Sequence, residues 1–242
     1  MKLIIKQEDV VKFANIMEAI RAVQNEVKFT LKPDGIQVMC FKGDGTTALD
    51  CFVDSKFFAV YDVKEQEEHI LDINEFKKTR LQKFKGDLNI EFGDRVKIWS
   101  ARASMSIPTY EDMDIIDKDI PNISHKSKIS FTAENFANML DLCAEIGNET
   151  DIEVMISGKD NKIDFKAYNY EKTKEMIYHY TKQEDDKDMD NFECRFTFSL
   201  LKNLQQKVID DGVLEFETEK PLVYKLDSEL VKLRYILAPR GD

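Results

Sequence analysis

The residues with the clearest chemical meaning are cations gathered in one short stretch, from Asp72 to Lys85. Five basic side chains stand there against two acidic ones, a net charge of +3: Lys77, Lys78, Arg80, Lys83 and Lys85 against Asp72 and Glu75. The whole chain of 242 residues carries a net charge of −11, which argues against indiscriminate binding of nucleic acid. The stretch is either a solvated helix face or a contact for phosphate groups, and in so acidic a chain a phosphate contact needs its cations concentrated in this way.

No other pattern points to an active site. Residues 42–47, Lys-Gly-Asp-Gly-Thr-Thr, look like a phosphate-binding loop but lack its Gly-Lys-Ser/Thr ending and precede no expected helix, so a hairpin turn is the better interpretation. The three histidines are far apart, and the four cysteines show no close pairing: His69, His125 and His179, and Cys40, Cys51, Cys143 and Cys194. We expect no enzyme, no catalytic residue, no metal and no cofactor, and the buried, reduced thiols of an intracellular protein.

The stretch from Pro108 to Ser127 predicts an extended connector. It has proline near each end and no helical or alternating period. Between Tyr110 and Ile120 its net charge is −4, yet it keeps apolar residues that a fully solvated linker has little reason to hold. We interpret it as a strap over an apolar surface, with an ordinary acidic linker as the alternative.

The chain repeats on either side of the strap. Phe13-Ala14-Asn15-Ile16-Met17 matches Phe136-Ala137-Asn138-Met139-Leu140, 123 residues later. Glu91-Phe92 matches Glu215-Phe216, 124 residues later. Two matches at nearly one offset predict two similar domains, residues 1–108 and 128–242, joined by a strap at 109–127.

Hydrophobic periodicity predicts the same order of elements in each half: strand, helix, strands, helix, strands. In the first half we expect helices over Val10–Val23 and Asp72–Lys85, with strands at Leu3–Ile5, Val27–Leu31, Ile36–Met39, Ala48–Val53, Lys56–Tyr61, Leu88–Phe92, Val96–Ala101 and Ala103–Ile107. In the second we expect helices over Ala133–Ile146 and Leu200–Ile209, with strands at Lys128–Phe131, Ile152–Ser157, Lys162–Ala167, Lys174–Tyr180, Glu193–Ser199, Val213–Glu217, Leu222–Leu226 and Val231–Leu237. The fold class is α+β with mainly antiparallel sheets.

Two such domains, an acidic strap and the ending Leu233-Arg234-Tyr235-Ile236-Leu237-Ala238-Pro239-Arg240 resemble the DNA polymerase sliding clamps of the proliferating cell nuclear antigen (PCNA) type. The resemblance covers the whole chain and is most specific in Tyr-Ile-Leu-Ala-Pro-Arg. It implies a head-to-tail trimer of two-domain subunits that encircles duplex DNA, with helices lining the hole and sheets outside. It also implies a joint between Ala103–Ile107 of one subunit and Lys174–Tyr180 of the next, both of which are otherwise open sheet edges.

The resemblance also implies which side chains face DNA: Arg21, Lys77, Lys78, Lys83, Lys202 and Lys207. Four positions that family members often fill with basic residues differ here: Ala14 and Asn15, and Asn138 and Asp141. The positive charge of the inner surface should therefore come mostly from the first domain, which leaves open a heterotrimer or a viral clamp.

A partner-peptide pocket is implied by a third set of positions: Phe41, Thr46, Ile120, Pro221, Ile236, Ala238 and Pro239. Nearly all are apolar, as a hydrophobic docking site requires. Ile236 replaces a frequent tyrosine and Ala48 a larger aliphatic residue, so the preferred peptide should differ.

The partners so implied are double-stranded DNA without sequence preference, DNA polymerase, a clamp loader, a flap nuclease, a ligase, and either copies of this chain or related subunits. No apolar run approaches the roughly 20 residues of a membrane span. We expect a cytoplasmic protein of an archaeal or viral host, nuclear if eukaryotic. Two alternatives stay open: a monomeric processivity factor on the same double fold, and a β-rich interaction module that never encircles DNA.

Overall fold

A computed structural model describes the chain except residues 111–119, 161, 185, 187–190, 205–210 and 241–242, and omits the side chains of residues 78, 79 and 211. The chain divides into two compact units. The first holds most of residues 1–120 together with Ser228–Leu233. The second holds Pro121–Asp227 together with Asp44–Thr47 and the residues from Arg234 on. Strand β17 (Val231–Leu237) is thus divided between the units.

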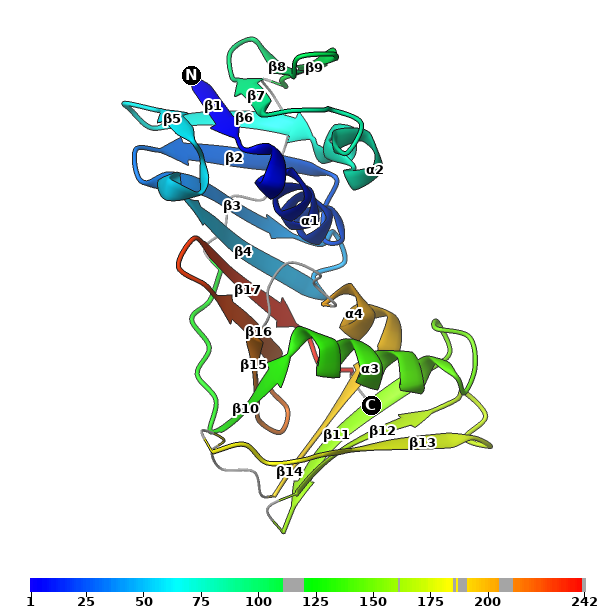
Figure 1. The fold of residues 1–242 in the computed structure, drawn as a ribbon. Coiled ribbons are helices and arrows are strands. Elements are labelled where there is room, and N and C mark those ends of the chain that lie inside the picture. The colour runs from blue at the N-terminus through cyan, green and yellow to red at the C-terminus, as the bar shows by residue number, and fades with distance from the viewer. Residues whose placement is uncertain (111–119, 161, 185, 187–190, 205–210, 241–242) are drawn as a thin grey trace. The chain divides into compact units, whose positions relative to one another are not determined.

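The first unit contains two short strand systems and two helices (Figure 1). One sheet has the strand order β5-β1-β7-β8-β9. In the other, the strands of this unit have the order β4-β3-β2-β6. The strands are β1 (Lys2–Ile5), β2 (Glu26–Lys32), β3 (Gly35–Phe41), β4 (Thr47–Asp54), β5 (Val60–Asp62), β6 (Glu67–Asp72), β7 (Leu88–Glu91), β8 (Arg95–Trp99) and β9 (Ser104–Pro108). The helices are α1 (Val10–Arg21) and α2 (Lys78–Leu81), with 3-10 turns η1 (Gln7–Asp9), η2 (Ser55–Phe57) and η3 (Ile73–Phe76).

The second unit repeats this plan. The order β13-β12-β11-β14 forms one sheet, and β10, β15 and β16 lie side by side in another. Its strands are β10 (Ser127–Thr132), β11 (Glu153–Lys159), β12 (Lys162–Tyr168), β13 (Glu175–Tyr180), β14 (Phe192–Thr197), β15 (Asp211–Phe216) and β16 (Leu222–Asp227), and its helices are α3 (Ala133–Ala144) and α4 (Phe198–Asn203). The described strand pairs of both units are antiparallel, which confirms the predicted α+β class.

The cores explain why the repeated segments became helices. Phe13 and Met17 are one turn apart on α1 and are buried, and Phe13 meets the rings of Phe57 and Phe76 at centroid distances of 6.4 Å. On α3 the equivalent Phe136 is 1% exposed and stacks on Tyr224 at 5.4 Å. Burying one such aromatic side chain is worth about 1.5–3 kcal/mol, so each helix is held by its apolar stripe.

The prediction of one continuous helix from Asp72 to Lys85 was wrong. The chain makes the 3-10 turn η3, becomes extended at Lys77, where ψ is 137°, and only then forms α2. Phe76 and Leu81 are both buried although they are five positions apart. In a continuous helix that spacing would turn them about 140° apart, so the chain must reset between them. The carboxylate of Asp72 also fixes the tight first turn by accepting the backbone N–H of Asn74.

Three further elements differ from prediction. The expected strand over Lys56–Tyr61 begins as η2, because Asp54 caps the N–H of Lys56, and the chain is paired as a strand only in β5. Strand β6 was not predicted, since of its six residues only Leu71 is fully buried. Helix α4 begins at Phe198, inside the expected strand Glu193–Ser199, and both Phe198 and Leu201 are buried in the core. The predicted end of this helix, Ile209, lies outside the described residues.

Within the described ranges the strap is visible only at its two ends. Tyr110 donates its backbone N–H to Ile70 O at 3.1 Å, and Ile120 is 8% exposed. The acidic residues between them lie outside the described residues. All four cysteines are buried and unpaired, as predicted, and burial raises the pKa of Cys40 to about 12.

Candidate nucleic-acid and partner-binding surfaces

The break in the basic stretch changes how its cations are presented. Lys77 is exposed at the extended residue between η3 and α2, and Lys83 is exposed just beyond α2. Neither forms an ion pair with a residue that the structure describes. Arg80 instead is paired with Glu75. Lys85 is exposed as well and has no ion pair within the described residues. Lys77, Lys83 and Lys85 are therefore the described cations of this stretch that remain available to an external anion.

Two of the other predicted DNA-facing cations have acidic neighbours. Arg21, in the last turn of α1, donates its Nε to Glu18 at 2.9 Å. Lys202 on α4 is paired with Glu149 across the fold of the second unit. Lys207 lies outside the described residues, as does the side chain of Lys78. A salt-bridged cation still attracts phosphate, but its partner's charge offsets most of that attraction at a distance.

Helix α3 presents an acidic surface to solvent. Its sequence, AENFANMLDLCA, contains no lysine or arginine. The exposed positions on this helix and at its C-cap are Glu134, Asn135, Asn138, Asp141, Leu142 and Glu145. Helix α1 exposes or half-exposes Lys12 and Arg21 instead. This contrast supports the prediction that phosphate attraction comes from the first unit.

The predicted pocket residues are divided between the two units. In the first unit Phe41 is half-buried at the end of β3 and Ile120 is buried. In the second, Ile236 is 7% exposed, whereas the remaining positions are half-buried: Thr46, Pro221, Ala238 and Pro239. The N–H of Ala238 bonds the carbonyl oxygen of Thr46 at 2.8 Å, so two of these residues meet within the second unit. That all seven form one pocket stays a prediction.

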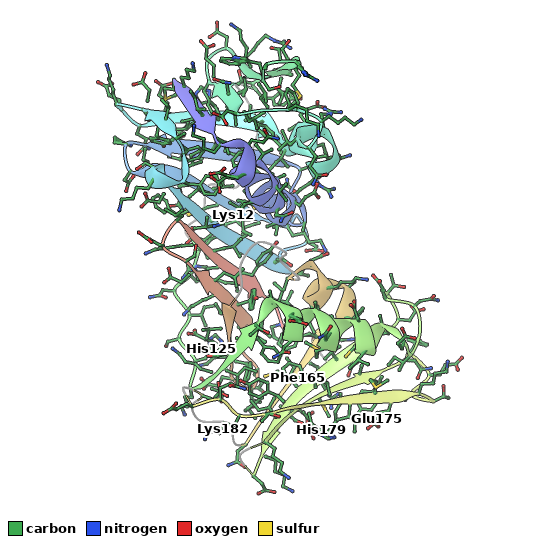
Figure 2. All side chains as sticks on the ribbon, in the orientation of Figure 1. Lys12, His125, Phe165, Glu175, His179 and Lys182 are labelled. Atoms are coloured by element: carbon green, nitrogen blue, oxygen red, sulfur yellow. The ribbon has the colours of Figure 1, made fainter. Side chains whose placement is uncertain are left out.

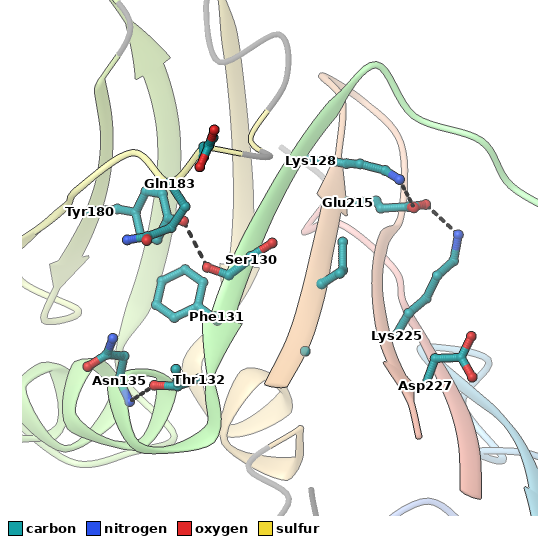
Figure 3. Close-up of a pocket in the computed structure, with 13 residues that line it drawn as sticks. Lys128, Ser130, Phe131, Thr132, Asn135, Tyr180, Gln183, Glu215, Lys225 and Asp227 are labelled. Carbon is teal, nitrogen blue, oxygen red and sulfur yellow. Dashed lines mark hydrogen bonds and ion pairs between the residues drawn. The ribbon is translucent and has the colours of Figure 1, made fainter. Parts of the chain in front are cut away.

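The second unit contains a cavity of about 710 Å³ that sequence analysis did not identify. Figure 3 shows the buried carboxylate of Glu215 between two lysines, Lys225 at 2.7 Å and Lys128 at 3.7 Å. On the other side, Tyr180 donates its hydroxyl to Ser130 O at 2.8 Å, and burial raises the pKa of Tyr180 above its ordinary value. The Glu215 carboxylate and the Tyr180 hydroxyl are thus paired with neighbours inside the second unit, and we assign the cavity no binding role.

Two strands stand at sheet edges. Strand β9 lies at one edge of the five-stranded sheet of the first unit, and β13 lies at one edge of the four-stranded sheet of the second. Figure 2 labels Glu175 and His179 along β13, and His179 is bonded to Asp164 of β12 at 2.8 Å. The strands predicted to join subunits are therefore edge strands in this fold.

Within the described residues no group of three or more His, Cys, Asp or Glu side chains is placed to hold a metal ion. The helices in the same part of the chain include none long and apolar enough to cross a membrane.

Comparison with known proteins gives a consistent answer, although no protein-family model matches the chain. A curated protein of Pyrobaculum aerophilum named DNA polymerase sliding clamp 1 is 21% identical over 254 residues, with 100% of this chain and 99% of the relative covered. Among solved structures, a PCNA2–PCNA3 complex from Sulfolobus tokodaii matches with a TM-score of 0.84 at 14% identity, covering 100% of both chains.

Two further structures show the same fold. PCNA from Thermococcus kodakaraensis has a TM-score of 0.83 at 16% identity, with 99% of each chain covered. A. fulgidus PCNA, solved with the C-terminal region of FEN-1 bound, has a TM-score of 0.82 at 16% identity, with 100% and 98% covered. Over its whole length the chain is thus similar in sequence to a curated DNA polymerase sliding clamp, and it shares the fold of the solved PCNA structures.

Proposed function

We propose that this chain forms a closed, head-to-tail trimeric ring around duplex DNA and tethers DNA polymerase and other replication and repair proteins to it. The observation that carries the proposal is that each unit ends one sheet in an edge strand that, among the described strands, is paired on one side only: β9 in the first and β13 in the second. A heterologous contact between two different edges repeats from subunit to subunit and closes into a ring when the rotation allows it. The curated sliding clamp, matched over its full length, supports this proposal.

The ring would hold DNA by topology, with weak attraction from cations of the first unit. Lys77 and Lys83 are exposed and free of ion pairs within the described residues, which suits a diffuse contact with phosphate. Because such contacts carry no sequence information, the ring can slide. The function needs no catalytic group, and we propose none for this chain.

Partners would dock by short peptides at the predicted pocket that includes Ile120 and Ile236. The A. fulgidus structure with the C-terminal region of FEN-1 supports a flap nuclease as one partner. We propose polymerase, clamp loader and ligase as further partners, and a cytoplasmic location in keeping with the archaeal relative.

Retention on circular DNA tests the proposal. Loaded onto a nicked plasmid by a clamp loader, the protein should co-elute with DNA at a salt concentration that removes ordinary electrostatic binders. Cutting the plasmid once should release it, because only a topological link depends on the absence of DNA ends. Equal retention before and after cutting would refute encirclement.

A further inference from the structure

The four-stranded sheet of the second unit has one face in the core and one face toward solvent. Ile163, Phe165 and Ala167 of β12 are buried, so the residues that alternate with them belong to the solvent face. This face contains a groove of about 660 Å³ beside the β11–β12 hairpin, wholly within the second unit. The described residues that line it include none of the predicted DNA contacts and none of the predicted pocket positions.

Strand registers arrange the side chains of this face in three rows about 7 Å apart, because residues two apart on a strand point the same way. From the hairpin end the rows are Lys159 and Lys162; then Asp164, Ser157 and Glu193; then Lys166, Met155 and Arg195. The rows are thus basic, acidic and basic. Three lysines of the outer rows line the groove and are called the groove lysines: Lys159, Lys162 and Lys166.

The carboxylates of the middle row already have partners, whereas the groove lysines have none in the described part of the chain. Asp164 lies 2.8 Å from His179 Nδ1, and Glu193 accepts Nη2 of Arg195 at 3.0 Å. The groove lysines form no ion pair with a described residue. In a chain of net charge −11, this face therefore keeps positive charge available to a ligand.

The hairpin end of the groove favours an anionic ligand. Lys159 and Lys162 are directly opposite one another, and like charges so placed destabilise a sheet. Both residues are exposed, and the turn between them contains a single carboxylate, that of Asp160. A bound carboxylate or phosphate would reduce the repulsion that remains.

The acidic middle row favours a polypeptide over a nucleic acid. A nucleic-acid strand along the groove would place consecutive phosphates over all three rows, including Asp164 and Glu193. In an extended polypeptide, carboxylates at positions i and i+4 are about 13 Å apart, as Lys162 and Lys166 are. A basic residue at position i+2 then meets the middle row. The only aromatic side chain among the described lining residues, Phe192, is 7% exposed, so bases have no ring to stack on.

We propose that this groove is a second docking surface, for a partner polypeptide that carries a basic residue between two acidic ones at alternate positions. Its outer carboxylates would pair with the groove lysines, and its central cation would meet Asp164 and Glu193. Each exposed ion pair contributes little by itself, so the contact is weak and adds to docking elsewhere on the protein. The inference goes beyond the proposed function, because neither the DNA contacts nor the peptide pocket needs this surface.

NMR of the whole chain with isotope-labelled methionine methyl groups tests the site, because Met155 is half-buried between Lys166 and Arg195. The probe is a capped peptide, Glu-Thr-Lys-Thr-Glu, titrated at an ionic strength of about 0.01 M, where charges act over about 30 Å. The methyl signal of Met155, identified by its loss in Met155→Leu, should shift and saturate. The signal of Met139, fully buried on α3, should stay in place. An unmoved Met155 signal would refute the site.

A second peptide of the same composition tests the order of charges. Glu-Thr-Glu-Thr-Lys has the same net charge but brings a carboxylate to the acidic middle row, so it should bind roughly fivefold more weakly. Equal affinity of the two peptides would refute the recognition of a charge pattern. A short oligothymidylate is the third probe. If it shifts the Met155 signal at a lower concentration than the first peptide does, the choice of a polypeptide is wrong.

Charge reversal tests the groove lysines. Lys159→Glu combined with Lys162→Glu should weaken binding of the first peptide roughly tenfold. The matched control combines Lys172→Glu with Lys174→Glu, which changes the net charge equally at exposed positions of the β12–β13 turn. This control should bind the peptide as the wild type does. Equal loss in both variants would show that net charge alone, and not this groove, attracts the peptide.

Retention on circular DNA separates this inference from the proposed function. The Lys159→Glu, Lys162→Glu variant should be retained on a nicked plasmid as the wild type is, because encirclement does not use the groove. A variant that is no longer retained would show that the groove contacts DNA, contrary to this inference. If the wild type is not retained, yet the first peptide shifts the Met155 signal, the proposed function is refuted and the docking surface stands.

Discussion

The imidazole Nε2 of His125 lies 2.6 Å from the carbonyl oxygen of Pro221, 96 residues further along the chain. For Nε2 to donate to this carbonyl, it must carry the proton of the neutral ring. Nδ1 is then left without a hydrogen-bond partner in the described structure, 3.9 Å from the carboxylate of Glu215. The side chain is fully buried, so this contact fixes the end of the strap to the second unit.

Acid should destabilise the protein through its buried histidines. Burial lowers the pKa of His125, and of His69, below the ordinary 6.5. The unfolded chain therefore binds protons before the folded one, and stability falls as pH drops from about 6.5 toward the lowered pKa values. The free energy of unfolding in urea should be lower at pH 5.5 than at pH 7.5.

A substitution locates this effect. His125→Gln keeps a donor for Pro221 O but cannot be protonated, so its loss of stability on acidification should be smaller than that of the wild type. His179→Gln is the control, because that ring is 75% exposed. An equal loss in all three proteins would show that His125 does not carry the effect.

Local sequence patterns were sufficient to predict most of the helices and strands. They were insufficient to predict which charged side chains form ion pairs. Helices α1 and α3 could be predicted because Phe13 and Phe136 begin apolar stripes at helical spacing. The break at Lys77 could not, since it depends on Phe76 and Leu81 sharing one core. The pairing of Lys202 with Glu149, 53 residues away, exists only once the second unit has folded.

Reversing Lys77 and Lys83 together should weaken electrostatic retention on DNA more than reversing Lys202. Both lysines are free of ion pairs within the described residues, whereas Lys202 is already offset by Glu149. Each lost phosphate contact should reduce the slope of log affinity against log salt by about 1. Binding to short duplex DNA at several salt concentrations measures this, with Lys162→Glu on the exposed surface of β12 as control. A slope unchanged by the Lys77 and Lys83 reversals would remove them from the DNA-facing surface.

Gly35 should tolerate no side chain. A Cβ added there would lie 2.3 Å from Val53 O and 2.7 Å from the ring of Phe52. The carbonyl belongs to the paired backbone of β4 and cannot move away without breaking the ladder. Gly35→Ala should cost about 1–3 kcal/mol of stability in urea unfolding. Gly43→Ala should stay close to the wild type, because no atom lies within 4 Å of the place its Cβ would take.

The last prediction concerns the partner pocket. Ile236 is 7% exposed and Ile120 is 8% exposed, so each offers a peptide only part of its side chain and contributes otherwise to packing. Replacement by Asp would bury a charge and confound binding with folding. Ile236→Ala is the better test: loss of an anchor at an interface centre costs about 2 kcal/mol, roughly thirtyfold in affinity. Calorimetry with a peptide carrying one aliphatic and two aromatic anchors measures it. The control is Leu142→Ala, a truncation of similar size at an exposed position of α3, which should bind the peptide as tightly as the wild type does. Light scattering should give both variants the same molecular mass as the wild-type assembly. Equal affinity of Ile236→Ala and wild type would place the peptide elsewhere.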